Sequence, residues 1–302
     1  MEKILGSLDF SNRVRENAIL RASFNELTRE TFNFDFTGWY NAGHWGECYI
    51  PHVLLDGEHV VSNVSVNLMP FSAGGEKKSY IQLGTVMTAK AYRGRGLNSR
   101  LMKRVVEEYK EKSDGIYLFA NDSVLSYYPK FGFHPVKEYE YYLPLTGKED
   151  VLPYRLEKVD FTSAEQCGRL YEIIGSGLKD GAGNPNDGMY MDGNPGLYQF
   201  WLDAEFGDML YLLPENGSYI AAGAEGGRLT LYQTFGEEKL DLVRLAAAFE
   251  GIQELVLGYT PADRGQLCVR EHKEEDCTLF VLGEDLQRIE REKIMFPLLS
   301  HA

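Results

Sequence analysis

The segment from residue 85 to residue 102 constrains the fold more than any other part of this 302-residue chain. An apolar stretch of strand character ends near residue 88, and arginine and glycine alternate at 93–96. A helix is predicted directly afterwards, because an apolar residue recurs every four positions from Leu97 onward. Glycines permit a tight turn, and the unpaired N–H groups at a helix start attract anions. The sequence therefore predicts a phosphate-binding loop between a strand and a helix.

The arginines of this loop favour a ligand over a turn that binds nothing. Arg93 and Arg95 add positive charge beside the helix start. A dinucleotide-binding loop fits poorly, since it requires a third glycine where Ser99 stands and lies at the first strand–helix crossover of its fold. Here the loop follows a predicted hairpin. A pyrophosphate held by another kind of fold is the better hypothesis.

The elements predicted around the loop alternate between strands and helices, which indicates a mixed α/β class. Residues 64–68 alternate apolar and polar side chains, the period of a half-buried strand. The predicted order for the first half is a helical stretch at 12–34, a loop or short helix at 35–46, a hairpin at 47–69, a strand at 80–88, a helix from 97, a strand at 116–120, a short helix at 123–130 and a strand at 139–143.

The second half repeats this kind of order after a boundary rich in proline and glycine at 144–156. Its predicted elements are a helix at 164–174, a long mobile loop at 175–196, paired strands over 209–235, a helix at 237–249 and strands at 252–258 and 278–282. We therefore expect two domains, residues 1–148 and 149–302, each with a mostly antiparallel mixed sheet flanked by helices.

Charge and composition narrow the partners. The net charge is −14, and residues 151–302 hold 26 acidic against 13 basic side chains. Nucleic acid is a poor partner for such a chain, whereas an acidic body attracts cationic small molecules or basic peptides. No apolar run is long enough to span a membrane, and the histidine and cysteine spacings fit no metal site. Four cysteines without a paired spacing suit reduced thiols and a cytoplasmic location.

Two motifs in order resemble the GNAT N-acetyltransferase superfamily. The run Arg93-x-x-Gly96-x-Asn98 is similar to the acyl-CoA loop of that family, which has glycine or alanine where Asn98 stands. A second motif follows about 25 residues later. Its matching residues are Asn121, Val124, Tyr128, Gly132 and Phe133.

A closer resemblance is to the Eis-type (enhanced intracellular survival) acetyltransferases, through Gly96-Leu97 with the helix that follows and through the run from Tyr128 to Phe133. That group carries a second, degenerate GNAT-like lobe and a third, sterol-carrier-like domain. The resemblance implies two tandem GNAT-like lobes here, with the first lobe catalytic, and we expect the third domain to be absent or reduced.

The resemblance implies an acyltransferase that uses acetyl-CoA as cosubstrate and needs no metal. Tyr128 takes the position of the family's general acid, which protonates the departing thiolate. The residues implied in acetyl-CoA binding are Val86, Met87, Thr88, Arg93, Gly94, Arg95, Gly96, Leu97, Asn98, Ser99, Asn121 and Ser123. The acceptor is expected to be a primary amine on a cationic small molecule or peptide.

The general base stays open at this point. Many relatives have a glutamate as the base on the strand before the loop, where this chain has Gln82 and Gly84. This leaves Glu47, His44, a chain of waters or the carboxylate of Ala302. An aromatic group, Phe36, Trp39, Tyr40 and Trp45, stands where the family lines its substrate site. Core packing is the alternative role for these rings.

The second lobe is expected to bind no CoA, because Glu237 and Glu238 stand in its corresponding loop and would repel a pyrophosphate. It is expected to close the substrate cleft and supply acidic walls. Two other functions compete with acetyl transfer. One is a catalytically silent CoA sensor or interaction module, and the other is a tandem-lobe acyl or aminoacyl transferase with a different donor. The oligomeric state is left open.

Overall fold

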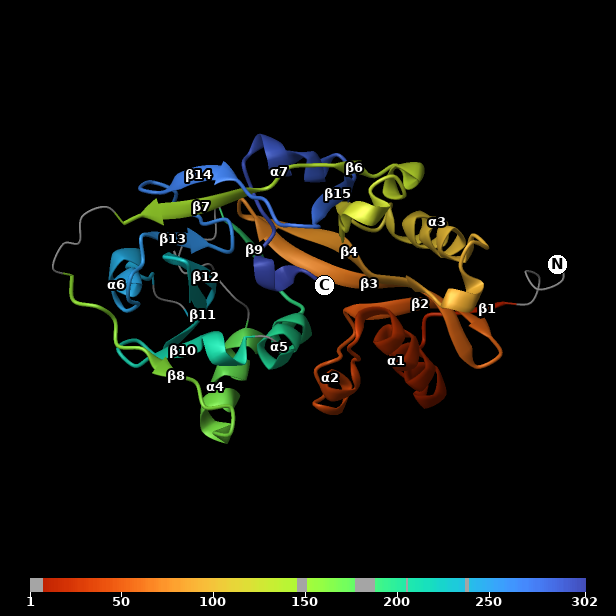
Figure 1. The fold of residues 1–302 in the computed structure, drawn as a ribbon, viewed down its shortest axis with the longest axis horizontal. Coiled ribbons are helices and arrows are strands. Elements are labelled where there is room, and N and C mark those ends of the chain that lie inside the picture. Colours follow the sequence, from red (N-terminus) through yellow and green to blue (C-terminus); the bar gives the residue numbers. More distant parts are fainter. Residues whose placement is uncertain (1–7, 146–150, 177–187, 205, 237–238) are drawn as a thin grey trace.

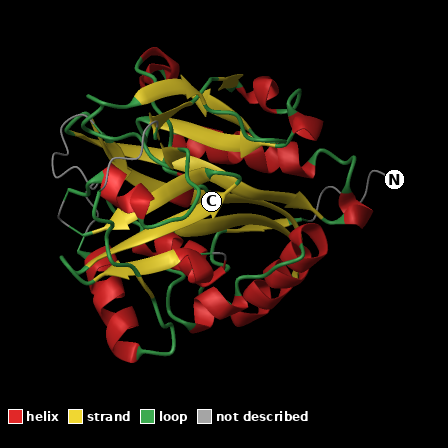
Figure 2. Cartoon of the chain, turned by 60° about the vertical axis from the view of Figure 1, so that its left-hand side comes forward, coloured by secondary structure: helices red, strands yellow, loops and turns green. Residues whose placement is uncertain are grey.

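The computed structural model describes residues 8–145, 151–176, 188–204, 206–236 and 239–302, which form two mixed β-sheets flanked by helices (Figures 1 and 2). This confirms the predicted class. The first half contains β1 (Asp9–Ser11), α1 (Ala18–Phe32), α2 (Thr37–Asn41), β2 (Tyr49–Asp56), β3 (His59–Ala73), β4 (Glu76–Thr88), α3 (Leu97–Tyr109), β5 (Gly115–Ala120), β6 (His134–Pro135) and β7 (Tyr139–Pro144). The second half contains β8 (Glu157–Lys158), α4 (Ala164–Gly175), β9 (Met189–Met191), α5 (Pro195–Ala204), β10 (Leu210–Leu213), β11 (Ser218–Glu225), β12 (Arg228–Phe235), α6 (Leu242–Ala247), β13 (Glu254–Leu257), β14 (Cys268–Glu271), β15 (Thr278–Leu282) and α7 (Arg288–Arg291).

The first sheet has the order β1-β2-β3-β4-β5-β15-β6, with β9 paired to the far end of β3. Its neighbouring strands are antiparallel except for β4 and β5, which run parallel. Helices α1 and α3 cover opposite faces of this sheet. Successive residues of a strand point to opposite sides, so neighbouring residues of β2 contact different helices. Val53 of β2 packs in the cluster with Phe24 of α1, whereas Leu54 packs with Leu101 of α3.

The second sheet has the order β14-β7-β13-β12-β11-β10-β8 and again contains one parallel pair, β12 with β13. Its helix α6 covers only Leu242–Ala247, which is shorter than the predicted helix at 237–249. Asp241 explains the later start, because its carboxylate accepts hydrogen bonds from the N–H groups of Val243 and Arg244. Residues 237 and 238 lie outside the described chain.

The two halves exchange strands. β7 lies between β13 and β14 in the second sheet, although the sequence suggested a last strand for the first lobe. In return, β15 lies between β5 and β6 in the first sheet. A cut at residue 148 therefore leaves each sheet with a strand from the other segment.

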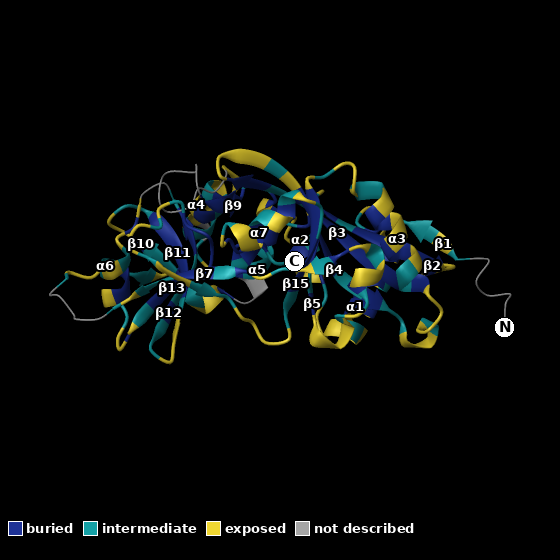
Figure 3. Cartoon of the chain, turned by 90° about the horizontal axis from the view of Figure 1, so that it is seen from above, coloured by how far each residue is buried: buried dark blue, intermediate teal, exposed yellow. Residues whose placement is uncertain are grey.

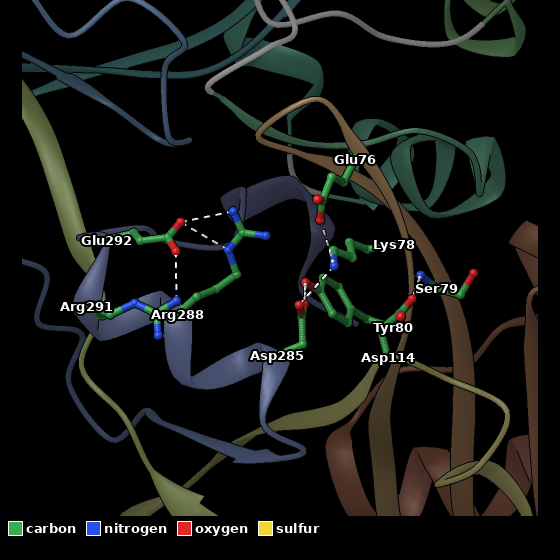
Figure 4. A network of polar contacts seen from close by, with 9 residues as sticks. All are labelled: Glu76, Lys78, Ser79, Tyr80, Asp114, Asp285, Arg288, Arg291 and Glu292. Atoms are coloured by element: carbon green, nitrogen blue, oxygen red, sulfur yellow. Dashed lines mark hydrogen bonds and ion pairs between the residues drawn. The ribbon is translucent and has the colours of Figure 1, made fainter.

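Polar contacts fasten the C-terminal segment to the β3–β4 hairpin (Figure 4). Lys78 Nζ donates to Asp285 Oδ1 at 2.9 Å, and the Tyr80 hydroxyl donates to the other oxygen of the same carboxylate at 2.5 Å. Burial raises the pKa of Asp285, but the hydrogen bonds from Tyr80 and Lys78 together lower it more. The pKa of this carboxyl therefore lies below its usual range. The segment after β15 is thereby fixed against the first lobe.

Part of the loop predicted at 175–196 is ordered structure. Residues 189–191 form β9, which pairs with β3 through Phe71 and Met191, and helix α5 already begins at Pro195. The strand was missed because glycine and asparagine surround a short apolar triplet that is fully buried against the first sheet. Residues 177–187 lie outside the described chain.

Strand β3 is buried on both faces, not on one as its alternating pattern predicted (Figure 3). Asn63, Ser65 and Asn67 are each 2% exposed or less. Asn63 Nδ2 donates to Ser65 Oγ at 2.9 Å and to the carbonyl oxygen of Thr85 at 2.7 Å. The polar side chains of β3 therefore lie in the interior, where that of Asn63 bonds to the backbone of β4.

Candidate active site

β4 separates from β5 halfway along its length. The two strands pair only through Tyr80, Ile81 and Gln82 on β4. β4 then continues to Thr88 along β3, and the register shifts at Thr85, whose φ of 47° is left-handed. Beyond Gln82, the edge of β4 that faces β5 therefore has no strand partner among the described residues. Free main-chain donors and acceptors at this edge can hold an extended ligand.

The arginine–glycine loop follows the end of β4 and leads into α3. Gly94 and Gly96 have φ of 76° and 73°, which only glycine adopts freely. Gly96 is the N-cap of α3 and brings no side chain to the first N–H groups. These donors therefore remain open to an anion, and the helix dipole adds to the attraction.

Arg93 and Arg95 are exposed and are anchored by part of their donor sets. Arg93 Nε donates to the carbonyl oxygen of Thr88 at 3.0 Å, and a terminal nitrogen of Arg95 donates to that of Ala91 at 2.8 Å. A guanidinium has five N–H donors, so each arginine keeps donors for a phosphate group.

Asn98, which departs from the family pattern, forms hydrogen bonds within the protein through its side chain. Its amide donates to the carbonyl oxygen of Asn63 at 3.2 Å, and its oxygen accepts from the Tyr127 hydroxyl at 2.6 Å. Ser99 Oγ also lies 3.5 Å from that hydroxyl. The asparagine side chain thus ties α3 to β3 and to the segment that carries Tyr128. Tyr127 was missed from the sequence, where nothing distinguished it from its neighbour.

Tyr128 is buried among aromatic rings. Its ring centroid lies 5.7 Å from Phe280 of β15 and 5.3 Å from Tyr127. Burial raises the pKa of Tyr128 to about 12, so its hydroxyl stays protonated at neutral pH. That hydroxyl has no hydrogen-bond partner among the described residues. Within the described part of the chain, the Tyr128 hydroxyl is therefore a hydrogen-bond donor without a protein partner beside α3.

The other residues expected to bind acetyl-CoA occupy several environments. Val86 packs against the α3 cluster, Met87 is buried under α1, and the Thr88 hydroxyl pairs with Ser62 Oγ at 2.8 Å. Asn121 donates to the Asp276 carboxylate at 2.9 Å, so its amide contacts the C-terminal half. Ser123 is exposed in the same segment.

A cavity of about 600 Å³ opens where α1, α2, β4 and α5 meet the last residues of the chain. Residues from both halves line it: Phe32, Phe34, Asp35, Phe36, Trp39, Tyr49, Asn67, Gln82, Thr85, Phe119, Asn194, Leu197, Phe200, Trp201, Glu274, His301 and Ala302. Its volume is typical of a site for a small organic molecule. The cavity reaches β4 where that strand has separated from β5.

The expected aromatic lining is half present. Phe36 and Trp39 line the cavity. Trp45 is buried, with its indole nitrogen donating to the carbonyl oxygen of Tyr49 at 3.0 Å, and Tyr40 lies under the Arg21 guanidinium. The rings that α5 supplies could not be predicted from the sequence, because their partners lie about 160 residues earlier in the chain.

The C-terminal residues lie at the polar end of the cavity, near the centre of the molecule (Figure 1). Gln82 Nε2 donates to the main-chain oxygen of Ala302 at 3.2 Å, and Trp201 Nε1 donates to that of His301 at 2.7 Å. Gly84 permits this approach, because a Cβ there would lie 2.6 Å from the Ala302 oxygen.

Of the candidate bases named from the sequence, Ala302 lies here, next to Gln82 and the Gly84 backbone. Glu47 has a side chain that is 91% exposed and pairs with Arg15, and the His44 ring meets Tyr171 edge-on outside the lining. His301 stacks on Phe119 with centroids 3.8 Å apart. Burial lowers the pKa of His301 to about 3, so this ring is neutral.

The second lobe has a corresponding strand separation but a different helix start. β12 continues to Phe235 after its pairing with β13 ends at Leu231. A cavity of about 730 Å³ lies at this point. The Asp241 carboxylate occupies the first N–H groups of α6, in contrast to the open start of α3 at Gly96. The start of α6 therefore does not offer a second anion site.

Two kinds of site are absent from the described part of the chain. No cluster of three or more histidine, cysteine, aspartate or glutamate side chains is arranged to hold a metal ion. Within the same residues, no helix has the length and apolar character of a membrane span.

Comparison with known proteins agrees with this geometry. Residues 17–136 match the family model of the acetyltransferase (GNAT) domain. A search of the curated proteins finds no match. The matched segment contains the motifs at 93–98 and 121–133, from which the resemblance to this family was predicted.

Solved structures resemble the chain over both halves. A probable N-acyltransferase from Enterococcus faecalis has 14% identity and a TM-score of 0.57, over 94% of this chain and 73% of the other. A GCN5-related N-acetyltransferase from Kribbella flavida has 16% identity and a TM-score of 0.53, over 91% and 70%. Eis1 from Mycobacterium abscessus has 11% identity and a TM-score of 0.51, over 90% and 73%. At these identities the likeness concerns the fold, and it confirms the predicted resemblance to Eis-type proteins at that level.

Proposed function

We propose that this GNAT domain binds acetyl-CoA at the loop before α3 and transfers the acetyl group to a primary amine held in the 600 Å³ cavity. The observation that carries the proposal is the unpaired edge of β4, which leads from the open helix start at Gly96 to the cavity at Gln82 and Thr85. A pyrophosphate at one end of this edge and an amine at the other fit a single extended donor between them.

Each part of the site has a role in this reaction. The first N–H groups of α3, with Arg93 and Arg95, bind the pyrophosphate. Main-chain groups of Val86, Met87 and Thr88 hold the pantetheine arm, and an N–H in this stretch polarises the thioester carbonyl as charge develops on its oxygen. Asn121 and Ser123 lie in the second motif segment, beyond β5, and we assign them to contacts with the donor.

Tyr128 acts on the departing sulfur. With a pKa of about 12, its phenol stays protonated until the thiolate forms. A thiol has a pKa of about 8.5, so complete proton transfer from the phenol is uphill, and a hydrogen bond that stabilises the thiolate is favoured. The proton that finally reaches sulfur comes from the attacking amine.

The amine must be neutral to attack. Aromatic walls lower the pKa of a bound amine by desolvation, which increases the neutral fraction without a dedicated base. Polar atoms of Gln82, Thr85 and Ala302 stand at the same end of the cavity to accept hydrogen bonds from the amine.

Calorimetric titration with acetyl-CoA tests the proposal. We expect a micromolar Kd, about −8 kcal/mol, and thiol release when an amine is added. Arg93→Glu should weaken binding at least about tenfold because it places a carboxylate beside the phosphates. Lys110→Glu, the same charge change at the far end of α3, is the matched control and should bind normally.

The competing functions give different outcomes. Tight binding of acetyl-CoA without turnover across an amine panel would indicate a silent CoA-binding module. Absence of heat at millimolar acetyl-CoA would contradict the proposal and favour a different acyl donor, in agreement with the third hypothesis from the sequence.

A further inference from the structure

The acceptor cavity has one aromatic end shared by the two halves of the chain. Phe34 of the first half and Phe200 of α5 lie with ring centroids 6.2 Å apart. Phe36 and Trp39 each lie 5.7 Å from the same Phe200 ring. The wall is therefore continuous across the junction of the two halves.

This wall is fixed in place before any ligand arrives. Trp39 Nε1 donates to the carbonyl oxygen of Gly196 at 2.8 Å, which joins α2 to the start of α5. A Cβ on Gly196 would lie 2.3 Å from the carbonyl oxygen of His44, so the two segments touch through their backbones. A preformed apolar surface binds an apolar group without a cost for ordering the wall.

Another end of the cavity holds a cluster of polar groups. It consists of the side chains of Asn67, Gln82 and Thr85 and the main-chain oxygen of Ala302, and the rings of Phe119 and Trp201 contact the neighbouring His301. The Tyr49 hydroxyl pairs with Thr85 Oγ1 at 2.8 Å between the two ends. This end adjoins the unpaired edge of β4, where the proposed acetyl donor lies. An acceptor with one amine at its tip and an apolar body behind it matches this division.

Carboxylates are scarce in the lining, although the chain as a whole has a net charge of −14. Among the described residues of the lining, they are the side chains of Asp35 and Glu274 and the carboxylate expected at Ala302. Asp35 is occupied by Arg29 Nε at 2.8 Å and by the N–H of Thr37 at 2.7 Å. The acidic walls expected from the second half are thus reduced to Glu274 and Ala302. A polyamine would place its further ammonium groups among the aromatic rings, where they lose their hydration without gaining a carboxylate.

We infer that the acceptor is a small primary amine attached through a short alkyl linker to an aromatic ring. The inference rests on the proposed function, and it narrows the expected cationic substrate to one with a single amine on an apolar body. The amine lies among Gln82, Thr85 and Ala302, and the ring packs among Phe34, Phe200 and their neighbours. Aromatic pairs at these separations contribute beyond the burial of their area.

An acceptor panel tests the substrate class. Indole-3-ethylamine and 2-phenylethylamine are compared with 1,4-diaminobutane, spermidine and a tripeptide amide that begins with phenylalanine. We expect kcat/KM for the two arylalkylamines to exceed that for the polyamines by at least about thirtyfold, because several apolar carbons are buried. A higher kcat/KM for a polyamine overturns the inference and leaves the proposed acetyl transfer intact. A higher value for the peptide overturns the assignment to a small molecule.

Binding is measured separately, so that failure of the proposed function is distinguishable. Two of the three tryptophans, Trp39 and Trp201, line the cavity, so intrinsic fluorescence reports its occupancy. A saturable change with 2-phenylethylamine, at concentrations where 1,4-diaminobutane gives none, supports the inference even without turnover. A fluorescence signal that does not saturate up to millimolar arylalkylamine overturns it, whatever acetyl-CoA does.

Paired variants locate the ring. Phe34→Ser and Phe200→Ser should each raise KM for 2-phenylethylamine at least about tenfold and leave KM for acetyl-CoA unchanged. Phe34→Leu should recover most of the loss, since it restores an apolar side chain. Phe161→Ser, a change at a phenylalanine that is 37% exposed and outside the cavity, is the control. Equal effects of all four substitutions would contradict the assignment.

Discussion

Replacing Gly96 with aspartate should weaken acetyl-CoA binding by placing a carboxylate at the open start of α3. In the second lobe, the Asp241 carboxylate accepts hydrogen bonds from two N–H groups at the start of α6, at 2.9 and 3.1 Å. Gly96 is the N-cap of α3, has no side chain and has a left-handed φ of 73°, whereas Asp241 has an extended backbone with φ of −79°. An aspartate at Gly96 would therefore act chiefly through its charge, beside the donors that the pyrophosphate needs.

The structure allows the size of the effect to be worked out. A Cβ at Gly96 meets no atom within 4 Å, so the new side chain fits without displacing its surroundings. The left-handed φ of 73° costs an aspartate about 1–2 kcal/mol. The protein should therefore still fold, with a free energy of unfolding lower than that of the parent by about this amount.

The loss of affinity is larger than the change in stability. A carboxylate about 4 Å from a phosphate charge is unfavourable by about 1 kcal/mol in water and about 4 kcal/mol near a protein surface. We expect a loss of about 2–4 kcal/mol in binding, which weakens Kd by about 30- to 1,000-fold.

Calorimetric titration with acetyl-CoA measures this loss, and Asn17→Asp is the matched control. Asn17 caps α1 on the opposite face of the sheet, where its side chain already accepts from the N–H groups of Ile19 and Leu20. The control adds the same charge at the same kind of position. If Gly96→Asp binds acetyl-CoA within about threefold of the parent while folding normally, the loop before α3 is not the pyrophosphate site.

Three further predictions follow from the geometry. Tyr128→Phe should lower kcat about 100-fold with little change in KM for acetyl-CoA. Tyr127→Phe, which removes the hydrogen bond to Asn98, is the control and should mainly lower the melting temperature. Equal kcat values for the two variants would contradict the role of Tyr128. Gly84→Ala should raise KM for the acceptor, because its Cβ would lie 2.6 Å from the main-chain oxygen of Ala302 and displace that residue; an unchanged KM would place the amine elsewhere. Burial raises the pKa of Glu138 from 4.5 to about 7, so the folded protein holds a proton that the unfolded chain has released, and this group lowers stability as pH rises through that window. Glu138→Gln should therefore gain about 2 kcal/mol in free energy of unfolding relative to the parent between pH 5 and pH 8, measured by chemical denaturation, and a loss on raising the pH would refute the assignment.

Local sequence signals were sufficient for most of the first lobe. The apolar stripe from Leu97 predicted α3, and the turn at Asp56-Gly57 predicted the hairpin of β2 and β3. Both depend on residues within a few positions of each other, so periodicity and turn chemistry define them. The short strand at 189–191 failed this test, because its stability comes from pairing with residues near Phe71.

The site residues were likewise predictable only where they are contiguous in the sequence. The loop at 93–98 could be recognised because its residues are contiguous and each has a conformational reason. The cavity could not, since α1, α5 and the last residues come together only in the folded chain. One signal was present but misinterpreted. Alternation along β3 indicated a solvent-facing polar side, whereas Asn63, Ser65 and Asn67 are buried next to the site. A run of small polar residues on a long strand is compatible with an interior, hydrogen-bonded face.

The strand exchange explains why the second half contributes to the candidate active site although its own helix start is capped. β15 lies between β5 and β6, and its Phe280 packs against Tyr128. The chain then continues through the Asp285 contacts and brings Ala302 to Gln82. Removing this segment would expose the open edge of β5 and leave Tyr128 without one of its walls. The second half therefore supplies three things to the first: a strand of its sheet, one side of the cavity of about 600 Å³ and a packing partner for Tyr128.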